Sequence, residues 1–290
     1  MISDSSIPQR SHESHEPRSR PWVMAILNAT PDSFSDGGRY SSVDAAVAYA
    51  ESAVEAGADI LDLGGESTRP GSDEVSEAEE LARVRPILEA LEGRLPVPIS
   101  VDTRRASVAE VALECGATWI NDTSALRDDP RLASVVAASD ARVVLMHRRG
   151  VPRTMQEDPR YHDPVREVRE FFEERVRFAT DRGIDLDRIV LDPGLGFGKR
   201  PEDNDRLVAG LDALRVDDLA ILIGASRKSF VARFDDAPAA DRLAGSLAYV
   251  AASAHRGADG FRVHDVRETV ALLDALTAID VSESEATWAG

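Results

Sequence analysis

From residue 21 to residue 280 the sequence alternates short apolar runs with longer segments of helical spacing, and this alternation constrains the fold most. Such an alternation is typical of parallel β/α units. Eight runs are predicted as strands: Trp22–Asn28, Asp59–Leu63, Val97–Asp102, Thr118–Asn121, Arg142–His147, Arg188–Asp192, Leu219–Gly224 and Gly260–His264. Helices are predicted over Val43–Glu55, Glu77–Leu91, Ser107–Glu114, Val165–Arg182, Ala239–Ala254 and Val266–Ala278. Eight units predict an α/β fold of the (β/α)8 TIM-barrel class.

Four similar turns indicate one domain. Gly57, Gly116, Gly183 and Gly257 each stand directly before a predicted strand, where glycine ends a helix by adopting the left-handed conformation. No linker interrupts this pattern, so we expect a single barrel domain over residues 21–280. Residues 1–20 are polar and lack the apolar stretch of a secretory signal, which predicts a disordered N-terminal tail. Residues 281–290 are expected to form a C-terminal tail.

The composition excludes several function classes. The chain has 34 basic and 52 acidic residues and a net charge of −18, which argues against a nucleic-acid partner and against anchoring on anionic lipid. It has no apolar run of about 18 residues, so no membrane span is expected. The single cysteine, Cys115, is compatible with a reducing, cytoplasmic location.

Lysine is almost absent from this chain. Only Lys199 and Lys228 are lysines among the 34 basic residues. An acidic, lysine-poor sequence predicts adaptation to concentrated salt, although a compositional bias of the genome would deplete lysine as well. A lysine retained in such a chain is expected to serve as a compact, rotatable donor, which arginine cannot replace.

Polar residues stand at or just after the end of every predicted strand. In a parallel barrel all eight ends meet at one rim, where TIM barrels bind their ligands. Any single position has a simpler explanation, because polarity rises wherever a loop begins. The eight together predict a ligand site; they are Asn28, Asp62, Asp102, Asn121, His147, Asp192, Ser226 and His264.

Two loops rich in glycine and proline follow the first two strands, over Ile26–Gly38 and Asp62–Gly71. With the motifs at the later strand ends, they make the sequence resemble the dihydropteroate synthases from about Trp22 to about Leu276. The later motifs are Ile99-Ser-Val-Asp102-Thr103, Ile120-Asn121-Asp122, Leu145-Met146-His147, Leu191-Asp192-Pro-Gly194-Leu-Gly196-Phe197, Ser226-Arg227-Lys228-Ser229 and Arg262-Val-His264-Asp265. Leu195 departs from the family pattern by replacing an aromatic residue. Arg148-Arg149 depart from it by following His147 where Met-Gln is usual.

The resemblance implies an enzyme of folate biosynthesis, a transferase that joins 6-hydroxymethyl-7,8-dihydropterin diphosphate to 4-aminobenzoate and releases diphosphate. It also implies that the pterin contacts Asp102, Asn121, Met146, Asp192, Phe197 and Lys228. Carboxylate and amide groups suit the guanidine-like edge of a pterin. Met146 fits a core position equally well. For Lys199, a role beside the pterin loop and a salt bridge remain open.

The resemblance further implies a diphosphate site and a catalytic set. Thr68, Arg69, Arg262 and His264 would bind the diphosphate, and Asn28 would hold Mg2+, a cation that takes few protein ligands. Phe34, Pro70 and Ser229 would contact the arylamine. The catalytic residues would be Asp36, Arg69, Lys228, Arg262 and His264, acting by ionisation of the carbon–oxygen bond. Dimers are usual in the family, which predicts a homodimer through the last helices.

Two other functions compete with this interpretation. A barrel methyltransferase that binds a methylated folate shares the Asp and Asn contacts, but it needs no diphosphate site. A pterin-binding paralogue without catalysis is expected to have lost residues of the loops or of the diphosphate site. This chain retains both sets, so the transferase is favoured.

Overall fold

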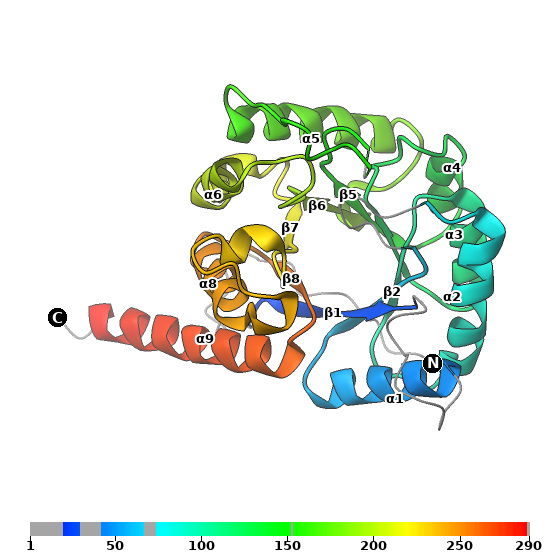
Figure 1. The fold of residues 1–290 in the computed structure, drawn as a ribbon, viewed down its shortest axis with the longest axis horizontal. Helices are drawn as coiled ribbons and strands as arrows, with labels where there is room; N and C mark the ends of the chain where they lie inside the picture. Colours follow the sequence, from blue (N-terminus) through cyan, green and yellow to red (C-terminus); the bar gives the residue numbers. More distant parts are fainter. Residues whose placement is uncertain (1–19, 30–41, 67–73, 152, 289–290) are drawn as a thin grey trace.

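The computed structural model describes residues 20–29, 42–66, 74–151 and 153–288. Its eight parallel strands close into a barrel in the order in which they occur in the sequence, and the helices surround them (Figure 1). The TIM-barrel prediction is therefore confirmed. The strands are β1 Trp22–Asn28, β2 Ile60–Gly64, β3 Ile99–Asp102, β4 Trp119–Asp122, β5 Arg142–Met146, β6 Ile189–Asp192, β7 Ala220–Ile223 and β8 Gly260–Val263.

The six predicted helices are present, as α1 Ser42–Glu55, α2 Glu77–Leu91, α3 Ala106–Glu114, α5 Pro164–Thr180, α8 Leu243–Ala254 and α9 Val266–Trp288. Three short helices were not predicted: α4 Leu132–Ala137, α6 Pro201–Ala209 and α7 Leu211–Leu214. Helices α4 and α7, with six and four residues, are too short to establish a helical repeat in the sequence. Within the described ranges, no helix combines the length and the apolar character that a membrane crossing requires.

Helix α9 extends beyond its predicted end at Ala278 and reaches Trp288. The boundary predicted at residue 280 therefore falls inside a helix. Neither glycine nor proline occurs between residue 279 and residue 289, so this stretch contains no stop signal. Helix α8 begins later than predicted, at Leu243, because the segment Ala239–Asp241 forms a separate 3-10 turn.

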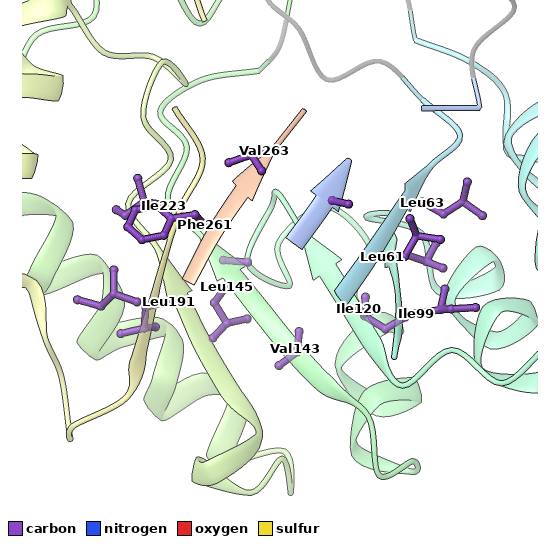
Figure 2. Close-up of a cluster of buried hydrophobic side chains, with 14 of the residues drawn as sticks. Leu61, Leu63, Ile99, Ile120, Val143, Leu145, Leu191, Ile223, Phe261 and Val263 are labelled. Carbon is purple, nitrogen blue, oxygen red and sulfur yellow. The ribbon is translucent and has the colours of Figure 1, made fainter. Parts of the chain in front are cut away.

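Strand side chains alternate between the outside and the inside of the barrel. The outward set packs under the helices as the main hydrophobic core, and Figure 2 shows some of these side chains, among them Leu61, Leu63, Phe261 and Val263. The inward set forms a separate apolar layer of Trp22, Met24, Ile60, Trp119, Val144, Val190 and Leu222. Gly260 belongs to β8 beside this layer, where a Cβ atom would overlap the indole ring of Trp22.

The same alternation places the polar residues. Asp62, Asn121 and Asp192 each stand two positions after a member of the inward apolar layer, so they share its inward direction one level higher. In the register of the sheet, Asp102 pairs with Asn121, and Met24 pairs with Arg262. The apolar layer thus forms a floor, and charged and amide groups stand above it at the carboxyl ends of the strands.

Candidate functional site

One side of the barrel mouth is organised around Arg262. Its Nε atom donates to Oδ2 of Asp62 at 2.6 Å, and one terminal nitrogen donates to Oδ2 of Asp102 at 2.9 Å. The amide of Asn121 also donates to Oδ2 of Asp62, at 3.0 Å. Strands β2, β3, β4 and β8 are therefore joined by one polar cluster above the floor, which we call the arginine cluster: Asp62, Asp102, Asn121 and Arg262.

Burial and charge act against each other in the arginine cluster. Burial raises the pKa of Asp102 to about 7, while Arg262 opposes that rise and the Asp62 carboxylate adds to it. Burial also disfavours the charged form of Arg262, but the carboxylates of Asp62 and Asp102 outweigh this effect and raise its pKa. Arg262 therefore stays charged, whereas Asp102 gains or loses its proton near neutral pH.

The opposite side of the mouth is organised around Lys228. Its ammonium group donates to the backbone carbonyl of Leu195 at 2.5 Å and lies 4.4 Å from the centre of the Phe197 ring. Burial lowers the pKa of Lys228 to about 8, although the nearby Asp192 carboxylate opposes this. Asp192 accepts a hydrogen bond from the backbone N–H of Gly194 at 2.7 Å, and burial raises its pKa. We call Asp192, Leu195, Phe197 and Lys228 the lysine cluster.

The two clusters meet at Gly224, just after β7. A Cβ atom built there would lie 3.8 Å from Nζ of Lys228, 3.9 Å from Oδ2 of Asp192 and 4.0 Å from Cβ of Arg262. The absence of a side chain at this position leaves room between one carboxylate and two cationic side chains. The structure thus brings Asp102, Asn121, Asp192, Lys228 and Arg262 to one mouth.

Other predicted site residues lie around the same rim. Met146 and Phe197 are buried and pack with Met155 in a small apolar cluster. Nδ1 of His264 lies 3.1 Å from Oγ of Ser226. Ser229 is exposed and begins the 3-10 turn Ser229–Ala232. Five further predicted residues lie outside the described residues: Phe34, Asp36, Thr68, Arg69 and Pro70.

Asn28 is suited to the proposed magnesium ion. It is half-buried at the end of β1, and its Oδ1 atom lies 3.9 Å from the Cβ position of Gly64, which is itself 3.9 Å from Oδ2 of Asp102. A neutral amide oxygen beside a carboxylate is a hard donor set of the kind that Mg2+ accepts while keeping several waters. Among the described residues, no group of three or more His, Cys, Asp or Glu side chains could hold a metal ion by itself.

Asp62 stands among the eight strand-end residues expected at the ligand site, but the sequence assigned it no specific role there. It is fully buried, and its Oδ1 atom has no hydrogen-bond partner within the described structure. A signal was present in the sequence, because a carboxylate inside the apolar run Ile60-Leu61-Asp62-Leu63 requires a buried partner. That partner, Arg262, is 200 positions away, and only the closure of the barrel makes the contact.

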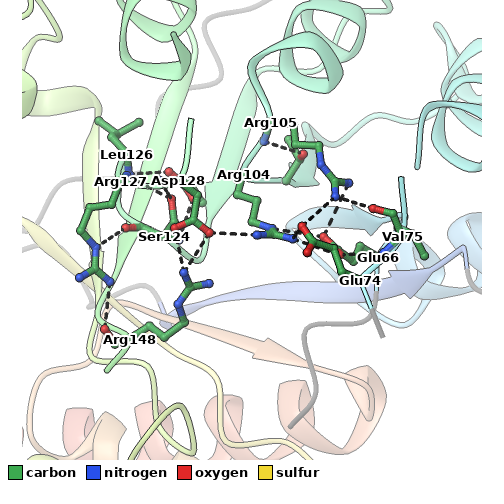
Figure 3. Close-up of polar contacts among 12 residues, drawn as sticks. Glu66, Glu74, Val75, Arg104, Arg105, Ser124, Leu126, Arg127, Asp128 and Arg148 are labelled. Atoms are coloured by element: carbon green, nitrogen blue, oxygen red, sulfur yellow. Dashed lines mark hydrogen bonds and ion pairs between the residues drawn. The ribbon is translucent and has the colours of Figure 1, made fainter. Parts of the chain in front are cut away.

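Outside the mouth, a chain of ion pairs links the loops that follow β2, β3, β4 and β5 (Figure 3). Arg104 binds Glu66, Glu74 and Asp128, and Asp128 in turn binds Arg148 at 2.9 Å. Arg148, one of the departures from the family pattern, thus has a partner in this network. The other departure, Leu195, buries its side chain in the main core and presents only its carbonyl to Lys228.

Comparison with known proteins shows which proteins this barrel resembles. The family model described as pterin binding enzyme matches residues 24–264. The dihydropteroate synthase of Escherichia coli K12 is 45% identical over 260 residues, which cover 90% of this chain and 92% of that protein. The Xanthomonas albilineans dihydropteroate synthase solved with 4-aminobenzoic acid superposes with a TM-score of 0.85 at 45% identity, covering 90% and 93% of the two chains.

The chain belongs to the dihydropteroate synthase family.

A second Xanthomonas albilineans structure of this family, solved with 7,8-dihydropteroate, has a TM-score of 0.81 and 42% identity, and covers 90% of this chain and 94% of that one. The family match begins within β1 and ends one residue after β8. It therefore spans the whole barrel, including both clusters, Asn28 and His264. The additional N-terminal residues of this dihydropteroate synthase family member lie outside the match.

Proposed function

We propose that this chain catalyses the dihydropteroate synthase reaction, joining 6-hydroxymethyl-7,8-dihydropterin diphosphate to 4-aminobenzoate in folate biosynthesis. The observation that carries the proposal is the meeting of the arginine and lysine clusters around Gly224. That mouth offers the carboxylate, amide and ammonium groups that a pterin edge requires. The similar proteins from Xanthomonas albilineans, solved with 4-aminobenzoic acid and with 7,8-dihydropteroate, support the choice of substrates.

The pterin would be read by Asp102, Asn121, Asp192 and Lys228. The carboxylates accept from its N–H groups, and Lys228 donates to a ring acceptor. The Asn121 amide nitrogen already binds Asp62, which fixes the orientation of the amide and directs its oxygen to the ligand. The buried side chains of Met146 and Phe197 supply an apolar surface for the flat ring.

The diphosphate would leave from the rim next to β8. Two nitrogens of the Arg262 guanidinium are engaged by Asp62 and Asp102, so only the remaining terminal nitrogen serves the leaving group. His264 contributes from the next inward position, and Arg69 from the second loop. When bound by Asn28, a magnesium ion supplies further positive charge to the diphosphate.

The chemistry needs no covalent intermediate with the protein. The bond between the pterin methylene carbon and the diphosphate oxygen breaks, and the diphosphate keeps the electron pair. The amine nitrogen of 4-aminobenzoate then forms the new bond to carbon and loses a proton. Arg262, His264 and Arg69 act by preorganised charge, which is worth most where water is excluded. In this proposal Phe34 and Pro70 would enclose the arylamine, Asp36 would lie near the positive carbon, Thr68 would bind the diphosphate and Ser229 would bind the arylamine carboxylate.

We also propose a cytoplasmic homodimer adapted to salt. The single cysteine supports a reducing compartment, and the net charge of −18 with only two lysines supports solubility in concentrated salt. Helix α9 and its neighbour α8 would provide the contact between protomers. Light scattering across a salt series tests both the assembly and the salt dependence.

The decisive experiment measures diphosphate release. Purified protein with Mg2+, the pterin diphosphate and 4-aminobenzoate should release diphosphate, and omission of either substrate or chelation of the metal should abolish release. The assay is run across a salt series so that each rate refers to folded protein. Pterin binding without turnover at every salt concentration would instead indicate a non-catalytic pterin-binding protein.

A further inference from the structure

The second lysine of the chain, Lys199, is buried among neutral groups. Its ammonium donates to the backbone carbonyls of Gly194 at 2.9 Å, Phe197 at 3.1 Å and His147 at 3.2 Å, and lies 2.9 Å from Nδ1 of the His147 ring. Only 3% of the residue is exposed. Of the two interpretations left open by the sequence, a salt bridge does not describe this arrangement, because the contacts are with carbonyls and an imidazole rather than with a carboxylate.

These contacts fasten the loop after β6 to the end of β5. The loop backbone lies directly on the neighbouring chain, since a Cβ atom on Gly194 would overlap the carbonyl of His147 and one on Gly198 would overlap the carbonyl of Arg149. The hydroxyl of Tyr161 adds a hydrogen bond to the carbonyl of Gly198 at 2.9 Å. Lys199 therefore closes a short backbone arch from Gly194 to Lys199.

The same arch forms the surroundings of Lys228. The carbonyl of Leu195 accepts from its ammonium, and the Phe197 ring lies 4.4 Å from it. The backbone of Gly196 also approaches the Lys228 stem, because a Cβ atom there would lie 3.1 Å from Cδ of Lys228. The two lysines have no hydrogen bond to each other, but both contact the same four-residue stretch, Gly194–Phe197.

We propose that Lys199 is a positioning residue that acts on the pterin site through Lys228, by holding the Gly194–Phe197 arch so that Leu195 and Phe197 place the Lys228 ammonium. This inference rests on the proposed function, because the pterin is the ligand that Lys228 would meet. It also explains the retention of both lysines in an arginine-rich chain. A small ammonium with three rotatable donors fits among converging carbonyls, whereas a planar guanidinium does not.

A double-mutant cycle on pterin affinity tests the inference. Lys228→Met should weaken binding of the pterin diphosphate by about 100-fold, the loss of one charge-assisted hydrogen bond. Lys199→Met should weaken it by about tenfold while changing the KM for 4-aminobenzoate much less. If Lys199 acts through Lys228, the double variant should bind within about threefold of Lys228→Met alone. Losses that multiply to about 1000-fold would overturn the inference.

A spectroscopic measurement gives an independent readout. Lys199→Met leaves Lys228 as the only lysine, so in protein labelled with 13C-lysine its NMR signal is assigned without further work. That signal should move in Lys199→Met. The matched control is Arg175→Met, which removes another buried cation, one that donates to the carbonyl of Leu126 away from the arch. The control should lower stability but leave both the lysine signals and the pterin affinity unchanged.

A milder variant tests the inference with a smaller risk of misfolding. Tyr161→Phe removes only the hydrogen bond to Gly198 and should weaken pterin binding by about threefold, and not at all when Lys228→Met is already present. Equal losses in both backgrounds would contradict the inference. If the wild-type protein binds no pterin diphosphate, the proposed function itself fails. If it binds and the losses are independent, only the positioning role fails.

Discussion

The two sides of the barrel mouth hold their positive charge in different ways. In the arginine cluster, Arg262 contacts two carboxylates at 2.6 and 2.9 Å. In the lysine cluster, the Lys228 ammonium has a carbonyl and an aromatic face as its closest partners. The pKa of Arg262 is raised and that of Lys228 is lowered to about 8.

This difference separates permanent charge from adjustable charge. A buried guanidinium between carboxylates cannot be neutralised at physiological pH, so it can orient Asp62 and Asp102 under all conditions. An ammonium whose hydrogen-bond partner is a neutral carbonyl, with a carboxylate nearby, retains its proton at modest cost near neutral pH and gains strongly from a ligand acceptor. The arginine cluster therefore keeps a fixed charge, whereas the charge of the lysine cluster responds to the ligand.

The largest effect should follow from removing Arg262, which pairs with two buried carboxylates. Arg262→Met leaves Asp62 and Asp102 buried without a cation, so we expect the free energy of unfolding to fall by about 3–5 kcal/mol. Binding of the pterin diphosphate should be lost as well. Urea denaturation and titration calorimetry measure the two effects. If the free energy of unfolding of Arg262→Met lies within about 1 kcal/mol of the wild-type value, the arginine cluster does not stabilise the barrel.

The next effect should come from Asp62→Asn, which keeps the shape and removes the charge. Arg262 and Asn121 each lose their strong acceptor, and we expect the free energy of unfolding to fall by about 1–3 kcal/mol. Pterin affinity should fall by about tenfold. Asp128→Asn is the matched control in the outer network, and it should change pterin affinity by less than about threefold. Similar losses of pterin affinity in the two variants would contradict the difference in role between the arginine cluster and the outer ion-pair network.

The pH dependence of pterin affinity should distinguish the two sides. Below about pH 7 Asp102 gains a proton and becomes a weaker acceptor for the pterin, and above about pH 8 Lys228 loses its proton and becomes a weaker, uncharged donor. Affinity should therefore be highest between these values and decline on both sides. Lys228→Met should abolish the alkaline decline because methionine carries no titratable group. An alkaline decline that persists in this variant would assign it to another group.

The same two groups affect stability with opposite signs. The raised pKa of Asp102 means that its contribution is most favourable below about pH 4 and is lost as the pH rises through about 7. The lowered pKa of Lys228 means that its contribution is lost as the pH falls from about 10.5 through about 8. Urea denaturation of wild type and Lys228→Met across this range separates the two contributions.

The smallest effect is expected in the outer network. Glu74 binds Arg104 but is 70% exposed, and exposed ion pairs are screened by water and salt. Glu74→Gln should change the free energy of unfolding by less than about 0.5 kcal/mol and leave the rate of diphosphate release unaltered. A larger loss, measured by urea denaturation at low and high salt, would mean that the loop network supports the mouth.

The sequence predicted the barrel because its strands are read from local signals. Apolar runs of four to seven residues, bounded by turn glycines, located all eight strands to within two residues. The short helices α4 and α7 carry too few turns for such a signal. Asp102, Asn121 and Asp192 were placed in one site because parallel strand ends share a rim, Lys228 and Arg262 were added through the family resemblance, and the structure shows all five together.

What the sequence could not provide is the pairing across the barrel. The contacts of Asp62 with Arg262 and of Lys199 with His147 join residues 200 and 52 positions apart. Whether a buried cation pairs with a carboxylate or with a backbone carbonyl depends on the strand register and on the conformation of the loops. No local sequence pattern specifies either. For that reason Asp62 was given no role beyond its place among the strand-end residues, and the role of Lys199 stayed open.

The burial of Lys199 and the partial burial of Lys228 have a practical consequence for handling this protein. Reagents that acylate or cross-link ε-amines meet none on the outer surface, because the chain carries no other lysine. Slow loss of catalytic competence during such treatment would therefore report how often the barrel mouth admits a small electrophile, without interference from other ε-amines.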